Sequence, residues 1–457
     1  MFMGIFLLFA GIGLGNSLVM KLNELNGEHS MDKVVVSAEN RPGSQSLDSF
    51  TPLNMNDLSG ILKTGDIAFS TNTVDSSLQA ADSEAAAQAE ITGTNYLYPE
   101  FLQINLMYGS FFTHKAEVDG EDVAVIDETL AWTLFKTLDA VGRKVEILGR
   151  EFKIVGVAEK GGSIIETLTD DGIPDVYIPA ARLLELEPSE AATCFQVKSA
   201  EAGLPGQYET EITNALQAIG KSPENYRITN YQTKEMLLSQ IPLIVQFIPG
   251  LAAIFILVGF FLKDVRASYI FIRTEFRDKD MKTVISDNLP HICMDILKLL
   301  LLAAGVCAIW LLIRFKLYIP SEYVPDELIN FAYYIYLIKS GIGGRISGMG
   351  HISPQVELIA NMGGILITLA TAIPAMISFV LIRSGFVRLK LLDVEPVKLT
   401  LLSALMLALS LVLTAGAASL LGLPEAFQIK SVLVLWTFIY IINIKIYNRK
   451  ESEQINV

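Results

Sequence analysis

Cysteine is scarce in this chain of 457 residues, which contains three. Cys194 stands alone in a long polar stretch, whereas Cys293 and Cys307 share one apolar run. Small extracellular domains that depend on disulfides carry many paired cysteines, so a disulfide framework is excluded here. The polar stretch must rely on its own hydrophobic core, and about 220 residues are enough to form one.

Catalytic and nucleotide-binding motifs are also missing from the sequence. No GxxxxGK[ST] loop occurs, so the backbone cradle and the lysine that contact ATP phosphates are absent. No GxSxG or HExxH motif occurs, and the four histidines are scattered. We therefore expect that the chain is not an enzyme by itself and holds no metal or cofactor.

Basic charge is in deficit, with 35 Lys and Arg against 49 Asp and Glu. Residues 21–240 carry most of the imbalance, with 16 basic and 34 acidic residues. No basic stripe exists to neutralise phosphates, which excludes nucleic acid as a partner. An acidic stretch of this size suits a domain in an aqueous exterior.

Long apolar runs are abundant, and they hold much of the 51% hydrophobic content. A helix needs about 20 residues to cross roughly 30 Å of hydrocarbon, and most of these runs approach or exceed that length. Six such blocks favour membrane spans over buried core helices. The predicted spans are 2–20, 241–262, 292–313, 358–382, 399–421 and 431–447.

The first apolar run lacks a basic leading region and an A-x-A-like cleavage site. This favours an uncleaved signal anchor over a cleaved signal peptide. Gly11 and Gly15 form a GxxxG pair that could pack against another helix. In the third run, Asp295 and Lys298 lie three residues apart, and we expect them to pair with each other.

The distribution of lysine and arginine predicts how the chain is oriented across the membrane. The segment 263–289 holds six of them, 383–398 holds four, and the tail after 444 adds three, whereas the longer segment 315–356 has three. The positive-inside rule therefore places the first three segments in the cytoplasm and 315–356 outside. Residues 21–240 are then extracytoplasmic, both termini are cytoplasmic, and the protein is a multi-pass plasma-membrane protein.

Residues 127–160 read as part of a folded aqueous domain. Asp127 suits a helix N-cap, and Leu130 and Leu134 share one helical face after it. Alternating apolar residues then flank Leu148-Gly149-Arg150, where a glycine with positive φ suits a tight β-hairpin turn. Further strands are predicted at 33–36, 123–126, 175–179 and 194–198, with helices at 180–186 and 209–218. The Ala-rich acidic stretch 75–92 reads as a solvated helix or a mobile loop, and its few large apolar residues favour the loop.

Four stretches in this region occur in the order of a known family. They read YPEFLQINLMYGSFFT (98–113), VAVIDETLAWTLF (123–135), AVGRKVEILGREFKIVGVAEK (140–160) and DVYIPAARL (175–183). In this order they resemble the periplasmic core domain of MacB-type ABC transporter permeases. Downstream, 271–298 resembles the FtsX-like segment without its Glu-Ile-Gly tripeptide and its Gly-Ala dipeptide, and LDVEPVKLT (392–400) resembles the family's closing motif.

The resemblance implies a multi-span α-helical membrane protein with a large α+β extracytoplasmic domain inserted between the first and second spans. It implies a first span at 1–20, a MacB-like core at 21–240, and an FtsX-like domain at 241–400 with three spans and a cytoplasmic helix at 271–289. Residues 401–457 form an additional hairpin with a short tail, outside the usual four-span plan. The implied partners are a cytoplasmic ABC ATPase, which binds the ATP, a second permease copy or paralogue, and the lipid bilayer.

The coupling segment is expected at 271–289, where apolar residues recur at roughly helical spacing among basic ones. An amphipathic helix of this kind can dock in a groove of an ATPase or lie on anionic lipid headgroups, and the acidic residues in it favour the protein partner. The predicted contact residues are Phe276, Arg277, Lys279, Met281, Lys282 and Ile285.

Two functions from different classes follow. The first is a permease subunit that transmits ATP-driven motion to its external domain, for export or extraction of a substrate at the outer membrane face. The alternative is a membrane-anchored receptor or adhesion protein with a ligand-binding acidic ectodomain. A simple receptor needs only one or two spans, and a basic helix at 271–289 is not expected of it.

Overall fold

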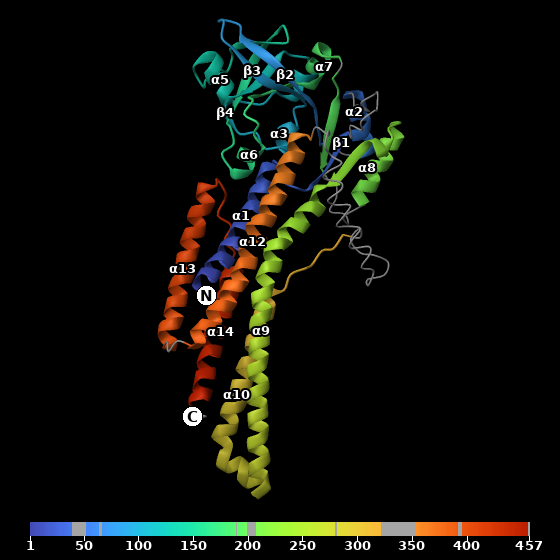
Figure 1. Cartoon of the computed structure of the whole chain (residues 1–457). Helices are drawn as coiled ribbons and strands as arrows, with labels where there is room; N and C mark the ends of the chain where they lie inside the picture. The colour runs from blue at the N-terminus through green and yellow to red at the C-terminus, as the bar shows by residue number, and fades with distance from the viewer. Residues whose placement is uncertain are drawn as a thin grey trace. The chain divides into compact units, whose positions relative to one another are not determined.

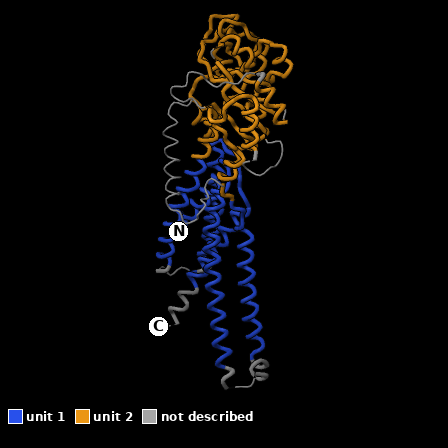
Figure 2. Tube along the Cα trace, turned by 90° about the vertical axis from the view of Figure 1, so that its right-hand side faces the viewer, with its two compact units in different colours: residues 1–18, 239–317, 366–457 blue, residues 19–238, 318–365 orange. Residues whose placement is uncertain are grey.

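The computed structural model describes residues 1–38, 52–63, 66–188, 190–198, 207–278, 281–320, 353–391 and 395–455. The chain divides into two compact units (Figure 2). We call Val19–Leu238 with Tyr318–Ile365 the domain unit, because it contains the sheet. Met1–Leu18, Ser239–Leu317 and Leu366–Val457 form the membrane unit.

The domain unit is built on a ten-stranded mixed sheet, and Figure 1 labels β1, β2, β3 and β4 of it. The strand order is β10-β1-β9-β2-β3-β8-β5-β7-β4, and β6 pairs with both β2 and β7. Two pairs, β3 with β8 and β5 with β7, are parallel, and the other pairs are antiparallel. The strands are β1 (Lys33–Ala38), β2 (Ile67–Ala80), β3 (Ala86–Thr94), β4 (Leu106–Gly109), β5 (Val123–Asp127), β6 (Lys144–Ile147), β7 (Arg150–Ala158), β8 (Asp175–Pro179), β9 (Ala192–Lys198) and β10 (Tyr226–Asn230).

Short helices connect these strands and cover two hydrophobic cores. One core joins α5 and α7 to the strands from β2 to β8, and Leu130, Phe152 and Ile178 are fully buried in it. The other core packs α2 and α8 on β1 and β9 through Leu58, Phe195 and Leu216. The helices are α2 (Pro52–Ile61), α3 (Tyr98–Phe101), α4 (His114–Val118), α5 (Glu128–Phe135), α6 (Ile164–Thr169), α7 (Ala180–Leu186) and α8 (Gln207–Ala218), with a 3₁₀ turn at Pro223–Asn225.

The stretch 127–160 folds as predicted. Asp127 caps α5, because its carboxylate accepts a hydrogen bond from the Leu130 amide at 2.7 Å. Strands β6 and β7 then form a hairpin whose two turn residues, Leu148 and Gly149, have φ values of 49° and 80°. Positive φ at both central positions defines a type I′ turn, whose twist matches that of the strands.

A substitution at Gly149 can measure how much stability the positive φ of this turn requires of a glycine. A Cβ placed there would meet no atom within 4 Å, so the cost of substitution is conformational rather than steric. We expect Gly149→Val to lower the unfolding free energy by about 1–3 kcal/mol in denaturant titrations of the full-length protein. Gly60→Ala is the control, since its Cβ is also unobstructed and α2 tolerates it. Equal stability of both variants would contradict the assigned turn.

The prediction of a loop at 75–92 is wrong, because β2 and β3 pair as a long hairpin through this stretch. Leu78 and Ile91 are fully buried, and Ala80 and Ala89 are nearly so, on the face that packs against α5. Small alanine side chains let the helix approach the strand closely. The alternation was present in the sequence, but alanine carries too little hydrophobic signal to distinguish a strand from a loop.

The membrane unit contains the apolar helices. Six helices of the described chain are long and apolar enough to cross a membrane, in agreement with the six predicted runs. Several continue beyond the apolar part, and α9, α10 and α14 are the clearest cases. The helices are α1 (Phe2–Leu25), α9 (Tyr231–Asp278), α10 (Met281–Ile313), α12 (Gln355–Leu391), α13 (Pro396–Leu420) and α14 (Ile429–Ile455).

Two helix contacts in this unit bear on the sequence analysis. Gly11 and Gly15 both face α12: a Cβ at Gly11 would lie 3.2 Å from Pro374, and one at Gly15 would clash with Thr371, so the GxxxG pair is a packing surface. The expected pairing of Asp295 with Lys298 is wrong. Lys298 pairs instead with Asp264 of α9 at 3.0 Å, and Asp295 accepts from the Ser268 hydroxyl at 2.9 Å. These contacts fasten α9 to α10.

Candidate functional site

The predicted coupling residues lie at the ends of two long helices. Phe276 and Arg277 are in the last turn of α9, and Met281, Lys282 and Ile285 are in the first turns of α10. Lys279 lies outside the described residues, and the side chains of the others are not placed. The docking role of 271–289 therefore stays a prediction, and the domain boundaries drawn from the sequence stay predictions as well.

A well-defined polar site lies in the domain unit, where three membrane helices meet the sheet. Strand β10 ends at Asn230 and α9 begins at Tyr231, so the sheet continues into the second span without a linker. The Asn230 side chain accepts a hydrogen bond from the Thr233 amide at 3.2 Å and thereby caps the helix. We call this region, with the ends of α1 and α12, the helix–sheet junction.

Lys33 is the first buried group of the junction. It opens β1, is only 1% exposed, and donates from Nζ to the carbonyl of Asn26 at 3.3 Å and to that of Phe101. Asn26 follows α1 and Phe101 ends α3, so the ammonium group lies at the negative ends of two helices. The rings of Phe101 and Tyr231 lie 5.9 and 5.8 Å from Nζ. Burial lowers the pKa of Lys33 well below its usual range, whereas these carbonyls and ring faces favour the charged form.

Glu357 is the second buried group, in the first turn of α12. Its side chain is 5% exposed, accepts a hydrogen bond from the Ser37 hydroxyl of β1, and lies 3.7 Å from the Arg227 guanidinium of β10. The positive end of the helix dipole favours a carboxylate at this position. Nearby, Tyr231 donates to the Val356 carbonyl at 3.2 Å and Lys234 donates to Asn361 at 2.8 Å. The adjacent strands β1 and β10 are thus both bonded to α12, and β10 also continues into α9.

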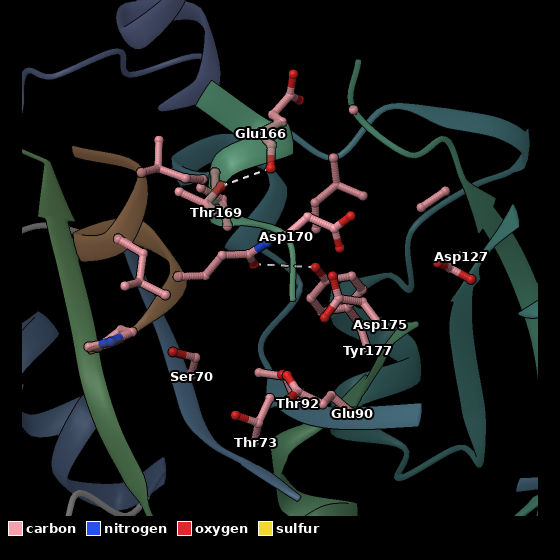
Figure 3. A pocket seen from close by; sticks show the side chains of 18 of the residues that line it. Ser70, Thr73, Glu90, Thr92, Asp127, Glu166, Thr169, Asp170, Asp175 and Tyr177 are labelled. Carbon is pink, nitrogen blue, oxygen red and sulfur yellow. Dashed lines mark hydrogen bonds between the residues drawn. The ribbon is translucent and has the colours of Figure 1, made fainter. Parts of the chain in front are cut away.

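An acidic cavity of about 230 Å³ lies in the same unit (Figure 3). Glu90 of β3 and Asp175 of β8 sit side by side in the strand register, and Asp127 and Asp170 also line the cavity. Burial, reinforced by neighbouring aspartates, raises the pKa of Glu90 to about 7 and that of Asp175 to about 7. Within the described part of the chain, no cluster of His, Cys, Asp and Glu is arranged to hold a metal ion.

The raised pKa of Asp175 makes the stability of the domain pH-dependent. The folded-state pKa lies near 7 and the usual value near 4, so between these values the folded state binds a proton that the unfolded state has lost, and the domain loses stability as the pH rises from about 4 to about 7. We expect Asp175→Asn to raise the unfolding free energy by about 1–2 kcal/mol at pH 8 and to have little effect near pH 4. Thermal unfolding at both pH values measures this, with Asp139→Asn as an exposed control. An equal gain at both pH values would contradict it.

Sequence reasoning missed Lys33 and Glu357. Each is a charged residue at the edge of an apolar segment, Lys33 before Val34-Val35-Val36 and Glu357 before the fourth span. A charge at the edge of an apolar segment usually faces water, and nothing local distinguishes these two. Their partners lie 68 and 320 residues away in the sequence.

The fold defines the class of the protein. An N-terminal helix, an α+β domain with a mixed sheet and five further long apolar helices make it a multi-span membrane protein. Residues 1–215 match the family described as the MacB-like periplasmic core domain. Residues 1–215 are thus similar to the MacB-like periplasmic core domain, the chain contains several membrane-spanning helices, and it has a distant homologue among ABC transporter permeases.

That homologue is the pyoverdine export ATP-binding/permease protein PvdT of Pseudomonas aeruginosa, with 29% identity over 143 residues. The match covers 31% of this chain and 21% of PvdT, and it does not include the ATPase part of PvdT. The matched family is a permease domain without a catalytic ATPase, consistent with the absence of a P-loop.

Among solved structures, the periplasmic region of MacB from Actinobacillus actinomycetemcomitans is similar, with 18% identity and a TM-score of 0.35 over 44% of this chain and 90% of that one. The extracellular domain of the noncanonic ABC-type transporter YknZ from Gram-positive bacteria has 18% identity and a TM-score of 0.33, covering 43% of this chain and 100% of that one. A domain of a permease protein from Porphyromonas gingivalis has 14% identity and a TM-score of 0.31, covering 44% of this chain and 90% of that one.

Proposed function

We propose that the chain is the transmembrane permease subunit of an ABC transporter complex. A separate cytoplasmic ATPase binds and hydrolyses ATP, and this chain transmits the resulting motion to its extracytoplasmic domain, which acts in export or extraction of a substrate at the outer membrane face. The homology to an ABC permease supports the ATPase partner. A second permease copy or paralogue and the lipid bilayer complete the proposed assembly.

The helix–sheet junction is the observation that carries the proposal. A transmitter needs a stiff connection, because a flexible linker would absorb helix motion as loop rearrangement. Here β10 continues directly into α9, Lys33 bonds the carbonyls after α1 and at the end of α3, and Glu357 bonds α12 to β1. A displacement of these helix ends is therefore passed to adjacent strands of one sheet. A receptor that needed only an anchor would have no use for three such connections.

The α9–α10 pair supports an ATPase contact at the other end of α9. Helix α9 continues from its apolar part near Leu262 to Asp278, about 24 Å at 1.5 Å per residue. The Asp264–Lys298 and Ser268–Asp295 contacts hold the two helices together where they leave the apolar region. A reinforced helical hairpin of this length suits a cytoplasmic partner better than a helix lying flat on lipid.

The orientation has its own test. In a background without Cys293 and Cys307, Ser83→Cys should react with a membrane-impermeant maleimide in intact cells, because the β2–β3 turn is extracytoplasmic in this proposal. Ser452→Cys, near the end of α14, should react only after the membrane is permeabilised. Labelling of both positions, or of neither, in intact cells would contradict the six-span orientation.

The function itself is tested by purification of the tagged full-length chain from its native membrane. We expect an ABC ATPase to co-purify in a fixed ratio and its hydrolysis rate to change when the chain is present. A protein that purifies without an ATPase, from membranes in which the ATPase of a known ABC complex is recovered with its permease, would favour the receptor alternative.

A further inference from the structure

The acidic cavity of Figure 3 receives side chains from one face of two paired strands. Glu90 and Thr92 of β3 share this face, as do Asp175 and Tyr177 of β8, because successive side chains of a strand point to opposite faces. The parallel register places Glu90 opposite Asp175 and Thr92 opposite Tyr177. Ile91, between the two polar residues of β3, is fully buried in the hydrophobic core on the other face. The sheet thus holds the polar groups of the cavity in fixed positions.

The lining of the cavity is strongly acidic, with seven carboxylates and one lysine. Three of these carboxylates are used by the fold itself. Asp127 caps α5, Glu166 caps α6, and Asp170 pairs with Lys160 at 2.7 Å. The single lysine is therefore already paired, and the lining keeps a large excess of negative charge.

Glu90 and Asp175 are not explained in this way. Neither forms an ion pair with a lysine or arginine in the described part of the chain, although burial raises the pKa of each to about 7. Two ionised carboxylates side by side repel each other, and a partly buried site strengthens the repulsion. A cation between them would remove the repulsion and replace the lost hydration.

The Thr92 hydroxyl indicates what kind of cation fits. Thr92 is 9% exposed, lies next to Glu90 in the cavity wall, and its hydroxyl has no hydrogen-bond partner among the described residues. Buried hydroxyls are normally hydrogen-bonded. A primary ammonium group has three N–H donors, which match the two carboxylates and this hydroxyl as acceptors. A metal ion fits less well, because the described residues contain no group of His, Cys, Asp and Glu arranged to hold one.

We propose that the cavity binds a small aliphatic diamine, with one ammonium group held between Glu90 and Asp175 and hydrogen-bonded to Thr92. The volume of about 230 Å³ is below the roughly 300–1,000 Å³ of sites for drug-sized ligands, so the ligand is small. Leu102 and Leu358 also line the cavity and suit a methylene chain, while the remaining carboxylates favour a second positive charge. This site does not depend on coupling to an ATPase, so its failure would leave the proposed function standing.

Isothermal titration calorimetry of the full-length protein in phosphatidylcholine nanodiscs tests the site, with cadaverine as the probe. The titration is run at pH 8, where both carboxyls are mostly ionised and the amines are still charged. Glu90→Gln with Asp175→Asn should weaken binding about tenfold or more, because one ammonium group loses both charged acceptors. Asp139→Asn with Glu146→Gln is the matched control. It removes the same charge at two exposed positions outside the cavity and should leave the affinity unchanged.

Thr92→Val supplies a second arm that leaves both carboxylates in place. Valine keeps the shape of the side chain and suits a strand, and we expect binding to weaken about three- to tenfold from the loss of one acceptor. The corresponding pentanediol should not bind, and calcium should not displace cadaverine. No binding of cadaverine, equal weakening by the control pair, unchanged affinity in both cavity variants, or displacement by calcium would each overturn the proposal. If the double variant fails to fold, Thr92→Val and the two chemical probes still decide.

Discussion

Replacing Lys33 with alanine should lower the unfolding free energy of the domain by about 3 kcal/mol, the largest stability effect we expect in this protein. The substitution removes the donor to the Asn26 and Phe101 carbonyls and leaves a cavity between the rings of Phe101 and Tyr231. Burying an ammonium group is itself costly, which opposes this effect. We expect the loss of these hydrogen bonds to outweigh that cost, because the Asn26 and Phe101 carbonyls would each lose a buried donor.

Two further variants separate the effect of the lost hydrogen bonds from the effect of the cavity. Lys33→Met keeps most of the volume but not the hydrogen bonds, and it should cost about 1–2 kcal/mol. Lys153→Met on the exposed face of β7 should change little. Pulse proteolysis of the full-length protein in detergent gives the free energies. A Lys33→Met protein as stable as the unmodified chain would show that the buried charge costs as much as its hydrogen bonds contribute.

The second large effect concerns the proposed ATPase contact. If 271–289 docks in a groove of the ATPase, its apolar side chains should matter more than its charges, because buried contacts dominate such interfaces and rim charges contribute little. Phe276→Ala with Met281→Ala should therefore abolish co-purification of the ATPase and leave membrane insertion intact.

A charge-altered pair is the matched control for that experiment. Arg277→Gln with Lys279→Gln should weaken co-purification modestly, and more so at low salt, where screening is weakest. If this pair removes the ATPase and the apolar pair does not, the contact is electrostatic rather than a helix in a groove. If neither pair alters the complex, the segment rests on lipid.

Structural features were predicted correctly from the sequence wherever they depend on neighbouring residues. The Asp127 cap, the Leu148-Gly149 turn and the step from β8 into α7 each depend on residues within a few positions, and the structure confirms all three. The six apolar runs were equally visible, since span length follows from bilayer thickness alone. The β2–β3 hairpin was missed because its buried face is largely alanine, whose burial depends on how closely α5 approaches.

Contacts between segments far apart in the sequence could not be predicted from the sequence. Ser37 and Glu357 are 320 residues apart, and Lys33 and Phe101 are 68 apart, so no local pattern could pair them. The pairing of Asp295 with Lys298 failed for the same reason, since α9 offers each a better placed partner. The acidic cavity was equally hidden, because Glu90, Asp127 and Asp175 come together only when their strands assemble.

The most direct test of transmission is a distance measured in the complex with its ATPase. Spin labels at Ser83→Cys in the β2–β3 turn and Lys430→Cys at the start of α14 report on the domain and the membrane helices, and both positions are exposed. We expect ATP to shift the distance distribution from double electron–electron resonance. The shift should reverse when ATP is removed and be absent from the Phe276→Ala, Met281→Ala chain. An unchanged distribution while the ATPase hydrolyses ATP would contradict the account.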